Sequence, residues 1–138
     1  MTTEQETARI GAAEAEVAKL TAEFATWMGD YLSQARSALA LAAADTGPGP
    51  RDALFGAAHN VKGLGGTFGY TLVTEIAESL CADLRARKQL DPAAAKLAKL
   101  HLDALEIVLK HNLTGDGGPM GAAVLVRLHG QSIGDRAR

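Results

Sequence analysis

The amino-acid sequence predicts an all-α fold: an antiparallel four-helix bundle with additional short helical segments at its ends. Apolar residues recur at the three- and four-residue spacing of a helix in four successive segments, and Gly- or Pro-containing breakers separate these segments. Only 4% of the residues are aromatic although 47% are apolar, so alanine, leucine and valine must build the core. Side chains of this kind favour closely packed helices over sheets.

The first and longest segment with helical periodicity covers residues 4–44, and Gly29 near its middle is a candidate site for a kink or a split. The run 45–50 contains two glycines and two prolines and ends this helix. A second helix is expected over residues 52–65. The apolar positions of the first segment are Ile10, Val17, Leu20, Phe24, Trp27, Tyr31, Leu32, Ala35 and Leu39.

A third helix is expected over residues 70–88 and a fourth over residues 92–111. Asp91 before Pro92 is typical of a helix N-cap followed by proline in the first turn. The fourth helix carries an apolar stripe that is predicted to face the core, with charged residues opposite. This stripe consists of Leu97, Leu100, Ala104 and Ile107.

At 138 residues the chain is long enough for one domain and too short for two ordinary ones. We therefore expect a single domain over residues 1–138, with its core at about 24–111. A loop and a short accessory helix at 120–128 are expected within residues 112–129, and a flexible tail over residues 130–138.

Charge and composition exclude several classes of protein. The net charge of −2 argues against nucleic-acid binding, and no apolar run is long enough to span a membrane. The N-terminus lacks the features of a signal peptide, so a cytoplasmic location is expected. The single cysteine, Cys81, cannot form an internal disulfide or a Cys-based metal cluster, and is best explained as a small buried hydrophobic residue.

The second helix directs His59 toward solvent. At 100° per residue, its apolar stripe lies within about 40° of the direction opposite His59. This stripe consists of Leu54, Ala57, Val61, Leu64 and Phe68. The face of His59 itself carries Phe55, Lys62, Gly63 and Gly66.

Four glycines, at positions 63, 65, 66 and 69, crowd into seven residues beside His59. A helical glycine costs about 1 kcal/mol relative to alanine, which this chain uses freely elsewhere. Either the glycines end the helix or allow two helices to approach closely, or they clear a surface for function. Packing alone does not explain why the cleared surface surrounds an outward histidine.

The residue types suit phosphoryl transfer. A neutral imidazole is a good nucleophile near pH 7, and a lysine one turn away can neutralise phosphoryl oxygens. Positions without side chains would let a partner's active site come close enough for in-line transfer. A carrier that passes a group between proteins must expose its histidine in this way.

These residues resemble the signature of histidine-containing phosphotransfer (HPt) domains of bacterial two-component phosphorelays. That signature is His-x-x-Lys-Gly, followed by small residues and a further Gly. The resemblance covers residues 24–111. The matching residues are Ala58-His59-Asn60-Val61-Lys62-Gly63, with Gly69 ten residues after the histidine and Phe68-Gly69-Tyr70 before the next helix.

The resemblance implies a four-helix bundle that carries a phosphoryl group between receiver domains and has no ATP site of its own. His59 would be the phosphoacceptor and Lys62 the cation that stabilises the phosphate. Gly63 and Gly66 would be the small residues that clear space for the partner. Phe55, on the same face, is expected to contact the partner, and packing into the bundle is the alternative for this side chain. The resemblance also implies a partner that is the receiver domain of a response regulator or a hybrid histidine kinase. The receiver would supply Mg²⁺, and this chain would need no cofactor, metal, membrane or nucleic acid and would act as a monomer.

Other candidate sites have simpler explanations. His101, His111 and His129 are accounted for by packing, a helix C-terminus and solvent, respectively. No pair of histidines or carboxylates has the spacing of a helical zinc site.

Two alternative functions remain. A sensor-kinase dimerisation and phosphoacceptor domain is also helical, but there an acidic residue usually follows the histidine, and here Asn60 does. A non-catalytic interaction bundle, or a degenerate phosphotransfer fold, would normally have lost the histidine or the lysine, and both are present.

Overall fold

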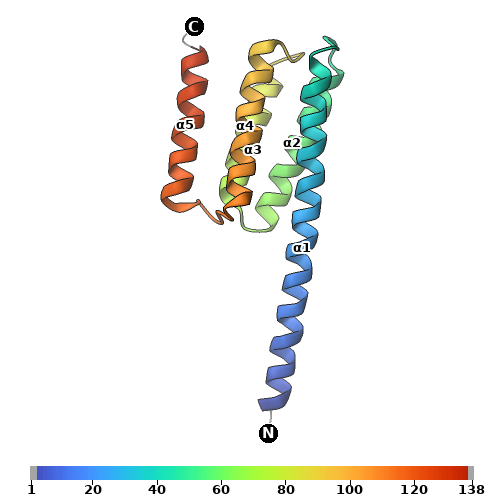
Figure 1. Ribbon diagram of the computed structural model, residues 1–138, viewed down its shortest axis with the longest axis vertical. Coiled ribbons are helices and arrows are strands. Elements are labelled where there is room, and N and C mark those ends of the chain that lie inside the picture. Colours follow the sequence, from blue (N-terminus) through green and yellow to red (C-terminus); the bar gives the residue numbers. More distant parts are fainter. Residues whose placement is uncertain (1–2, 137–138) are drawn as a thin grey trace.

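The computed structural model describes residues 3–136, and the side chains of residues 3–130. Within this range the chain forms five helices and no strand (Figure 1). The all-α prediction is confirmed. The helices are α1 (Thr3–Ala42), α2 (Gly49–Thr67), α3 (Thr71–Arg85), α4 (Pro92–Lys110) and α5 (Gly118–Arg136).

The first four helices surround one core. Helix α1 contacts α2 and α4, and α3 contacts the same two helices, so the four close into a bundle. Figure 1 shows the chain reversing direction at each connection, with α5 lying against the outer side of α4. At one end of the bundle the amide of Leu72 donates to the carbonyl of Gly115, and the amide of Gly115 donates to the carbonyl of Gly69. These bonds tie the α2–α3 loop to the α4–α5 loop.

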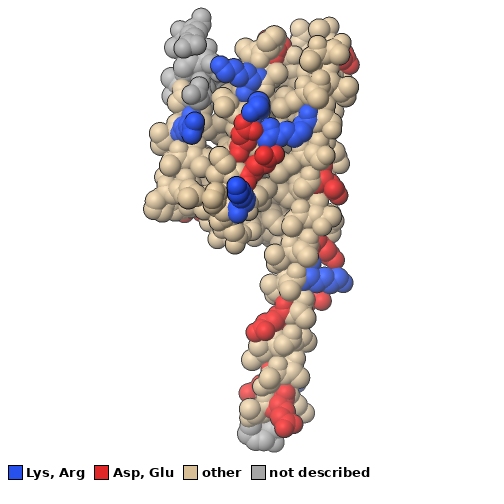
Figure 2. All heavy atoms as spheres, viewed as in Figure 1, with Lys and Arg blue, Asp and Glu red and all other residues tan. Residues whose placement is uncertain are grey.

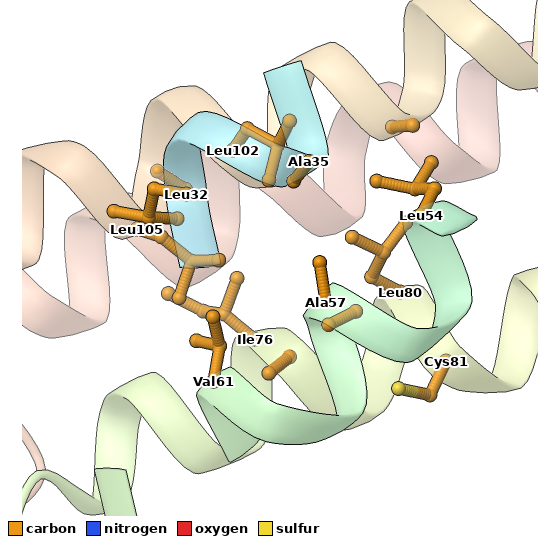
Figure 3. Close-up of a cluster of buried hydrophobic side chains, with 14 of the residues drawn as sticks. Leu32, Ala35, Leu54, Ala57, Val61, Ile76, Leu80, Cys81, Leu102 and Leu105 are labelled. Atoms are coloured by element: carbon orange, nitrogen blue, oxygen red, sulfur yellow. The ribbon is translucent and has the colours of Figure 1, made fainter. Parts of the chain in front are cut away.

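Aliphatic side chains fill the core, and alanines let the helices approach closely (Figure 3). Leu54 and Val61 of α2 project toward Ile76 and Leu80 of α3 in this view, and Leu105 of α4 lies across from them. The largest fully buried apolar side chains are Met28, Leu54, Val61, Leu72, Val73, Ile76, Leu80, Leu84, Leu102, Leu105 and Val108.

Several helix boundaries differ from the prediction, and α3, for example, ends at Arg85 rather than at residue 88. Helix α1 runs unbroken through Gly29, because Met28 and Leu32 on either side are anchored in the core. Helix α2 is longer at both ends, since Pro50 needs no hydrogen-bonded amide in the first turn and the glycines do not stop the helix. Helix α5 extends from Gly118 to Arg136 where a short helix and a flexible tail were predicted. A single glycine such as Gly130 costs about 1 kcal/mol and does not by itself end a helix.

The predicted core stripe of α4 is only partly correct. Leu97 and Ala104 are buried, but Leu100 is half-buried and Ile107 is 42% exposed. The buried face lies to one side of that stripe and includes Ala98, Leu102, Leu105 and Val108. Leu100, Ala104 and Ile107 instead line a shallow hollow between α4 and α5. The predicted N-cap is confirmed, because the Asp91 carboxylate accepts from the amide of Ala94 at 2.7 Å.

The N-terminal half of α1 projects beyond the bundle (Figure 1). Every described residue from 3 to 22 is exposed, and this segment is called the α1 extension below. Ile10, Val17 and Leu20 were grouped with the core positions by their spacing, yet they are 59%, 62% and 40% exposed. The bundle itself begins at Phe24, where α1 first meets the rings of Phe68 and Tyr70.

His101 is a core residue. Its Nδ1 lies 2.8 Å from the carbonyl oxygen of Leu97, to which it must donate, and its Nε2 accepts from the hydroxyl of Ser79 at 3.0 Å. Burial lowers the pKa of His101 below its ordinary value of 6.5 because it penalises the charged imidazolium. The packing explanation for this histidine is confirmed.

This burial predicts how stability depends on pH. In the unfolded chain His101 takes up a proton near pH 6.5, whereas in the folded chain it stays neutral to a lower pH. The unfolded state therefore binds more protons in that window, and the free energy of unfolding falls as the pH drops below 6.5. The slope from this group is at most about 1.4 kcal/mol per pH unit. Urea unfolding at a series of pH values should show the slope in wild type and in the exposed control His111→Gln, and lose it in His101→Gln. An unchanged slope in His101→Gln would contradict this account.

Candidate functional site

The site centres on His59 in the middle of α2. Leu54 and Val61 on the opposite side of this helix are fully buried, and they fix its rotation so that His59 is exposed. The imidazole stacks on the ring of Phe55, one turn earlier, with 6.4 Å between ring centroids and 16° between ring planes. No hydrogen bond to either ring nitrogen is made by the part of the chain that the structure describes. Stacking thus orients the ring while both nitrogens remain open to a reactant.

Lys62 is held by α3. Its Nζ lies 2.6 Å from Oε2 of Glu78, and Oε1 of Glu78 lies 3.1 Å from the guanidinium of Arg85. The bond to Lys62 and then that to Arg85 lower the pKa of Glu78 to about 2, so this carboxylate is charged at neutral pH. The charge of Lys62 is therefore already offset by Glu78 before any phosphoryl group arrives.

Two guanidinium groups lie close to the ring of Phe55. The Arg51 Cζ is 4.9 Å from the ring centroid, and that of Arg85 is 5.7 Å away. Arg51 also donates to the carbonyl oxygens of Leu84, in the last turn of α3, and of Arg87, two residues beyond its end. The side chain expected to face solvent is therefore half-buried. It supports His59 and carries cationic groups on its flanks.

The glycines beside His59 lie in different structural environments. A Cβ at Gly63 would meet nothing within 4 Å, and one at Gly66 would reach only the Thr74 hydroxyl at 3.4 Å. A Cβ at Gly65 would instead lie 2.6 Å from Cγ1 of Val73, so this glycine is needed for α2 to pack against α3. Gly69 has a φ of +82°, which suits glycine in the turn after α2. The packing explanation therefore applies to Gly65, whereas Gly63 and Gly66 leave open surface beside His59.

The match to a known family agrees with this geometry. The family model of the Hpt domain matches residues 19–125, which is more than half of the chain. The chain belongs to the Hpt domain family. No curated protein and no solved structure shows a significant match. The Hpt family comprises helical bundles that serve histidine phosphotransfer in two-component phosphorelays and interact with receiver domains. Hpt domains are phosphocarriers rather than enzymes with an ATP site of their own.

The family match begins at residue 19, well inside α1. Most of the α1 extension therefore lies outside the part of the chain that the Hpt domain accounts for. The match includes α2 with His59, Lys62, Gly63 and Gly66, and it ends within α5.

Sequence reasoning missed three residues that shape this Hpt surface. Glu78 and Arg85 come from α3, and Arg51 precedes Phe55 by one turn. No spacing rule reveals the first two, because their approach to Lys62 and Phe55 depends on how α3 is rotated and shifted along α2. Arg51 could have been found, since it lies four residues before Phe55 on the same helix.

The rest of the described Hpt domain contains no second cluster of reactive side chains like the one around His59. Among the described residues, no group of three or more His, Cys, Asp or Glu side chains could hold a metal ion. The Cys81 thiol is fully buried, and burial raises its pKa, so it packs as a hydrophobic residue. No helix in the described range combines the length and apolar character needed to cross a bilayer.

Proposed function

We propose that His59 accepts a phosphoryl group from the aspartyl phosphate of one receiver domain and passes it to the aspartate of another. The observation that carries this proposal is the combination of an exposed imidazole with an open surface at Gly63 and Gly66. Gly63 and Gly66 place no side chain in the way of a partner's active site that approaches along this surface. The transfer takes place in the cytoplasm and uses no ATP bound by this chain.

The transfer conserves atoms and charge. A lone pair on the distal ring nitrogen attacks phosphorus, an N–P bond forms, and the P–O bond to the receiver's aspartate breaks. The aspartate leaves as a carboxylate, and the reverse sequence loads the next receiver. The receiver supplies the Mg²⁺ that neutralises phosphoryl oxygens on its own side. This chain supplies alignment through the Phe55 stack and positive charge through Lys62.

Lys62 is expected to exchange its carboxylate partner for the phosphoryl oxygens. The ammonium is half-exposed, and Glu78 is its one ion-pair partner among the described residues, so rotation of its flexible stem can move it toward His59, three residues away. Arg85 remains with Glu78 and keeps that carboxylate paired after Lys62 leaves. Under this proposal the lysine alternates between two anionic partners, the Glu78 carboxylate and the phosphoryl group.

Removing Lys62 should slow transfer without unfolding the bundle. A hydrogen bond between charged groups is worth about 1.5–3 kcal/mol, so Lys62→Ala is expected to lower the transfer rate roughly tenfold to a hundredfold. Rapid-quench measurement of label moving from a phospho-receiver gives this rate. Lys99→Ala is the matched control, because Lys99 is an exposed, ion-paired lysine on α4. Equal rates for both variants would remove Lys62 from the mechanism.

The experiment that tests the proposed function is transfer from a radiolabelled phospho-receiver to the purified chain. We expect the chain to acquire label that is lost in acid and retained in alkali, as an N–P bond requires. Adding a second, unlabelled receiver should then remove the label from the chain. A failure to acquire label from any of several receivers would favour the alternative of a non-catalytic interaction bundle.

A further inference from the structure

Helix α3 holds Lys62 by its backbone and by its side chain. The hydroxyl of Thr74 donates to the carbonyl oxygen of Lys62 at 3.3 Å, and the Glu78 carboxylate, one turn further along α3, lies 2.6 Å from the Lys62 ammonium. Both contacts require α3 to lie close to α2, which Gly65 permits because it places no Cβ against Val73. The position of the Lys62 ammonium is therefore set by α3 as well as by its own helix.

The two oxygens of the Glu78 carboxylate have separate partners. Oε1 lies 3.1 Å from the guanidinium of Arg85, which in turn lies 5.7 Å from the centre of the Phe55 ring. Oε2 is closed off from solvent, and the ammonium of Lys62 is the cation beside it. A charged oxygen in such a place loses stabilisation when its cation leaves. The pair between Lys62 and Glu78 is therefore unfavourable to open.

We propose that Glu78 is a positioning residue that limits how tightly this chain holds its phosphoryl group, by competing with the phosphoryl oxygens for the ammonium of Lys62. This inference rests on the proposed function and adds to it the control of an equilibrium. In each transfer an N–P bond at His59 replaces the P–O bond at a receiver's aspartate, which leaves as a carboxylate, and unloading is the reverse. A carrier must therefore bind the group about as tightly as its receivers do, and a free ammonium beside His59 would favour the loaded chain.

Removal of the Glu78 charge should strengthen the hold on the phosphoryl group. Glutamine has nearly the same shape as glutamate, but its amide oxygen binds an ammonium less tightly than a carboxylate does. Lys62 is then free to pair with the phosphoryl oxygens without first giving up a strong ionic contact. The direct repulsion between Glu78 and the phosphoryl group is the smaller effect, because Lys62 and Arg85 offset the charge of this carboxylate.

The equilibrium of label exchange with one receiver tests the proposal. The ratio of labelled chain to labelled receiver, approached from either side, gives the equilibrium constant for loading. This constant should be roughly threefold to thirtyfold larger for Glu78→Gln than for wild type, as expected for the loss of one nearby charge. The quality of docking alters the rates but not this constant. An equal or smaller constant in Glu78→Gln, with label present on both chains, would overturn this inference alone. The absence of label from both chains would overturn the proposed function as well.

The Lys62→Ala background shows whether Glu78 acts through the lysine. In that background Glu78→Gln should change the equilibrium constant little, because no ammonium is left to compete for. If the charge of Glu78 acted directly on the phosphoryl group, its removal would have at least the same effect there, since Lys62 no longer offsets it. A full effect in the Lys62→Ala chain would therefore contradict the competition for Lys62.

Asp103 provides the matched control. Like Glu78 it pairs with one lysine and one arginine, Lys99 at 2.7 Å and Arg36 at 2.8 Å. The side chains of Asp103 and Glu78 are 38% and 42% exposed. These control pairs join α1 to α4, and Figure 2 shows acidic and basic side chains gathered over these two helices. Asp103→Asn should leave the equilibrium constant at the wild-type value, and a rise equal to that of Glu78→Gln would refute a specific role of Glu78.

Phosphorus NMR provides a readout that needs no receiver. Phosphoramidate phosphorylates accessible histidines directly, and in a His111→Gln/His129→Gln chain His59 is the exposed histidine that remains. The phosphorus chemical shift, followed against pH, reports the pKa of the phosphoryl group. A released Lys62 favours the more negative form of that group, so its pKa should be lower in Glu78→Gln than in the chain with Glu78. Equal pKa values in the two chains would overturn the inference even where receivers exchange label normally.

Discussion

A chain with glutamine in place of His59 is expected to acquire no label from any phospho-receiver, while its thermal unfolding midpoint stays within error of the wild type. His59 is the exposed imidazole between Phe55 and Lys62, and glutamine has no nitrogen lone pair able to attack phosphorus. The loss should therefore be complete rather than partial. Exposed substitutions typically change stability by no more than about 0.5 kcal/mol, and the ring contact that is removed is the stack on Phe55.

The remaining histidines provide the control for this experiment. His111 is exposed at the C-terminal end of α4, and His129 is exposed on α5. Glutamine at either position should leave label uptake at the wild-type level. Label on the His59→Gln chain would place the phosphoacceptor at another residue, and a large fall in its unfolding midpoint would contradict the outward position of His59.

Alanine at Gly65 is expected to destabilise the bundle, whereas alanine at Gly63, two residues earlier, should stabilise it. A methyl group at position 65 would lie 2.6 Å from Cγ1 of Val73, a fully buried residue that has little room to move. Overpacking of this kind costs roughly 1–3 kcal/mol. At position 63 the added methyl group meets nothing, and replacement of a helical glycine contributes up to about 1 kcal/mol. Urea unfolding measures both changes, and equal stabilities would refute the packing assigned to Gly65.

A larger substitution at Gly63 distinguishes an effect on partner access from an effect on folding. Gly63→Leu should fold as well as the wild type, because its side chain enters open solvent beside His59. It should nevertheless slow label uptake, because the new side chain occupies the surface along which a receiver approaches. The label that does arrive should still be acid-labile. Uptake at the wild-type rate would show that Gly63 clears no docking surface.

Local periodicity was sufficient to predict which face of α2 carries the site. The orientation of His59 follows from the spacing of Leu54, Ala57 and Val61, because a helix converts sequence spacing directly into direction. The helices and the single core also follow from local signals such as the cap at Asp91.

Contacts between helices could not be predicted in the same way. Glu78 meets Lys62 only because α3 packs on α2 at a particular rotation and height, which the spacing within either helix does not encode. The two glycines at 63 and 65 look alike in sequence, and only the position of Val73 distinguishes them. The stripe on α4 was assigned to the core from its helical spacing alone, and Leu100, Ala104 and Ile107 instead line the hollow toward α5.

Under the proposed function, the ion pairs around His59 give the unloaded and loaded forms surfaces of opposite sign. Arg51, Lys62 and Arg85 contribute three positive charges, and Asp52 and Glu78 contribute two negative ones, which leaves a local charge of +1. A phosphoryl group adds about −1.5 to −2 and makes the loaded surface negative. An acidic partner is therefore attracted before transfer and repelled after it, which helps the two proteins to separate. Salt should then slow the encounter that loads the chain and slow the dissociation that follows.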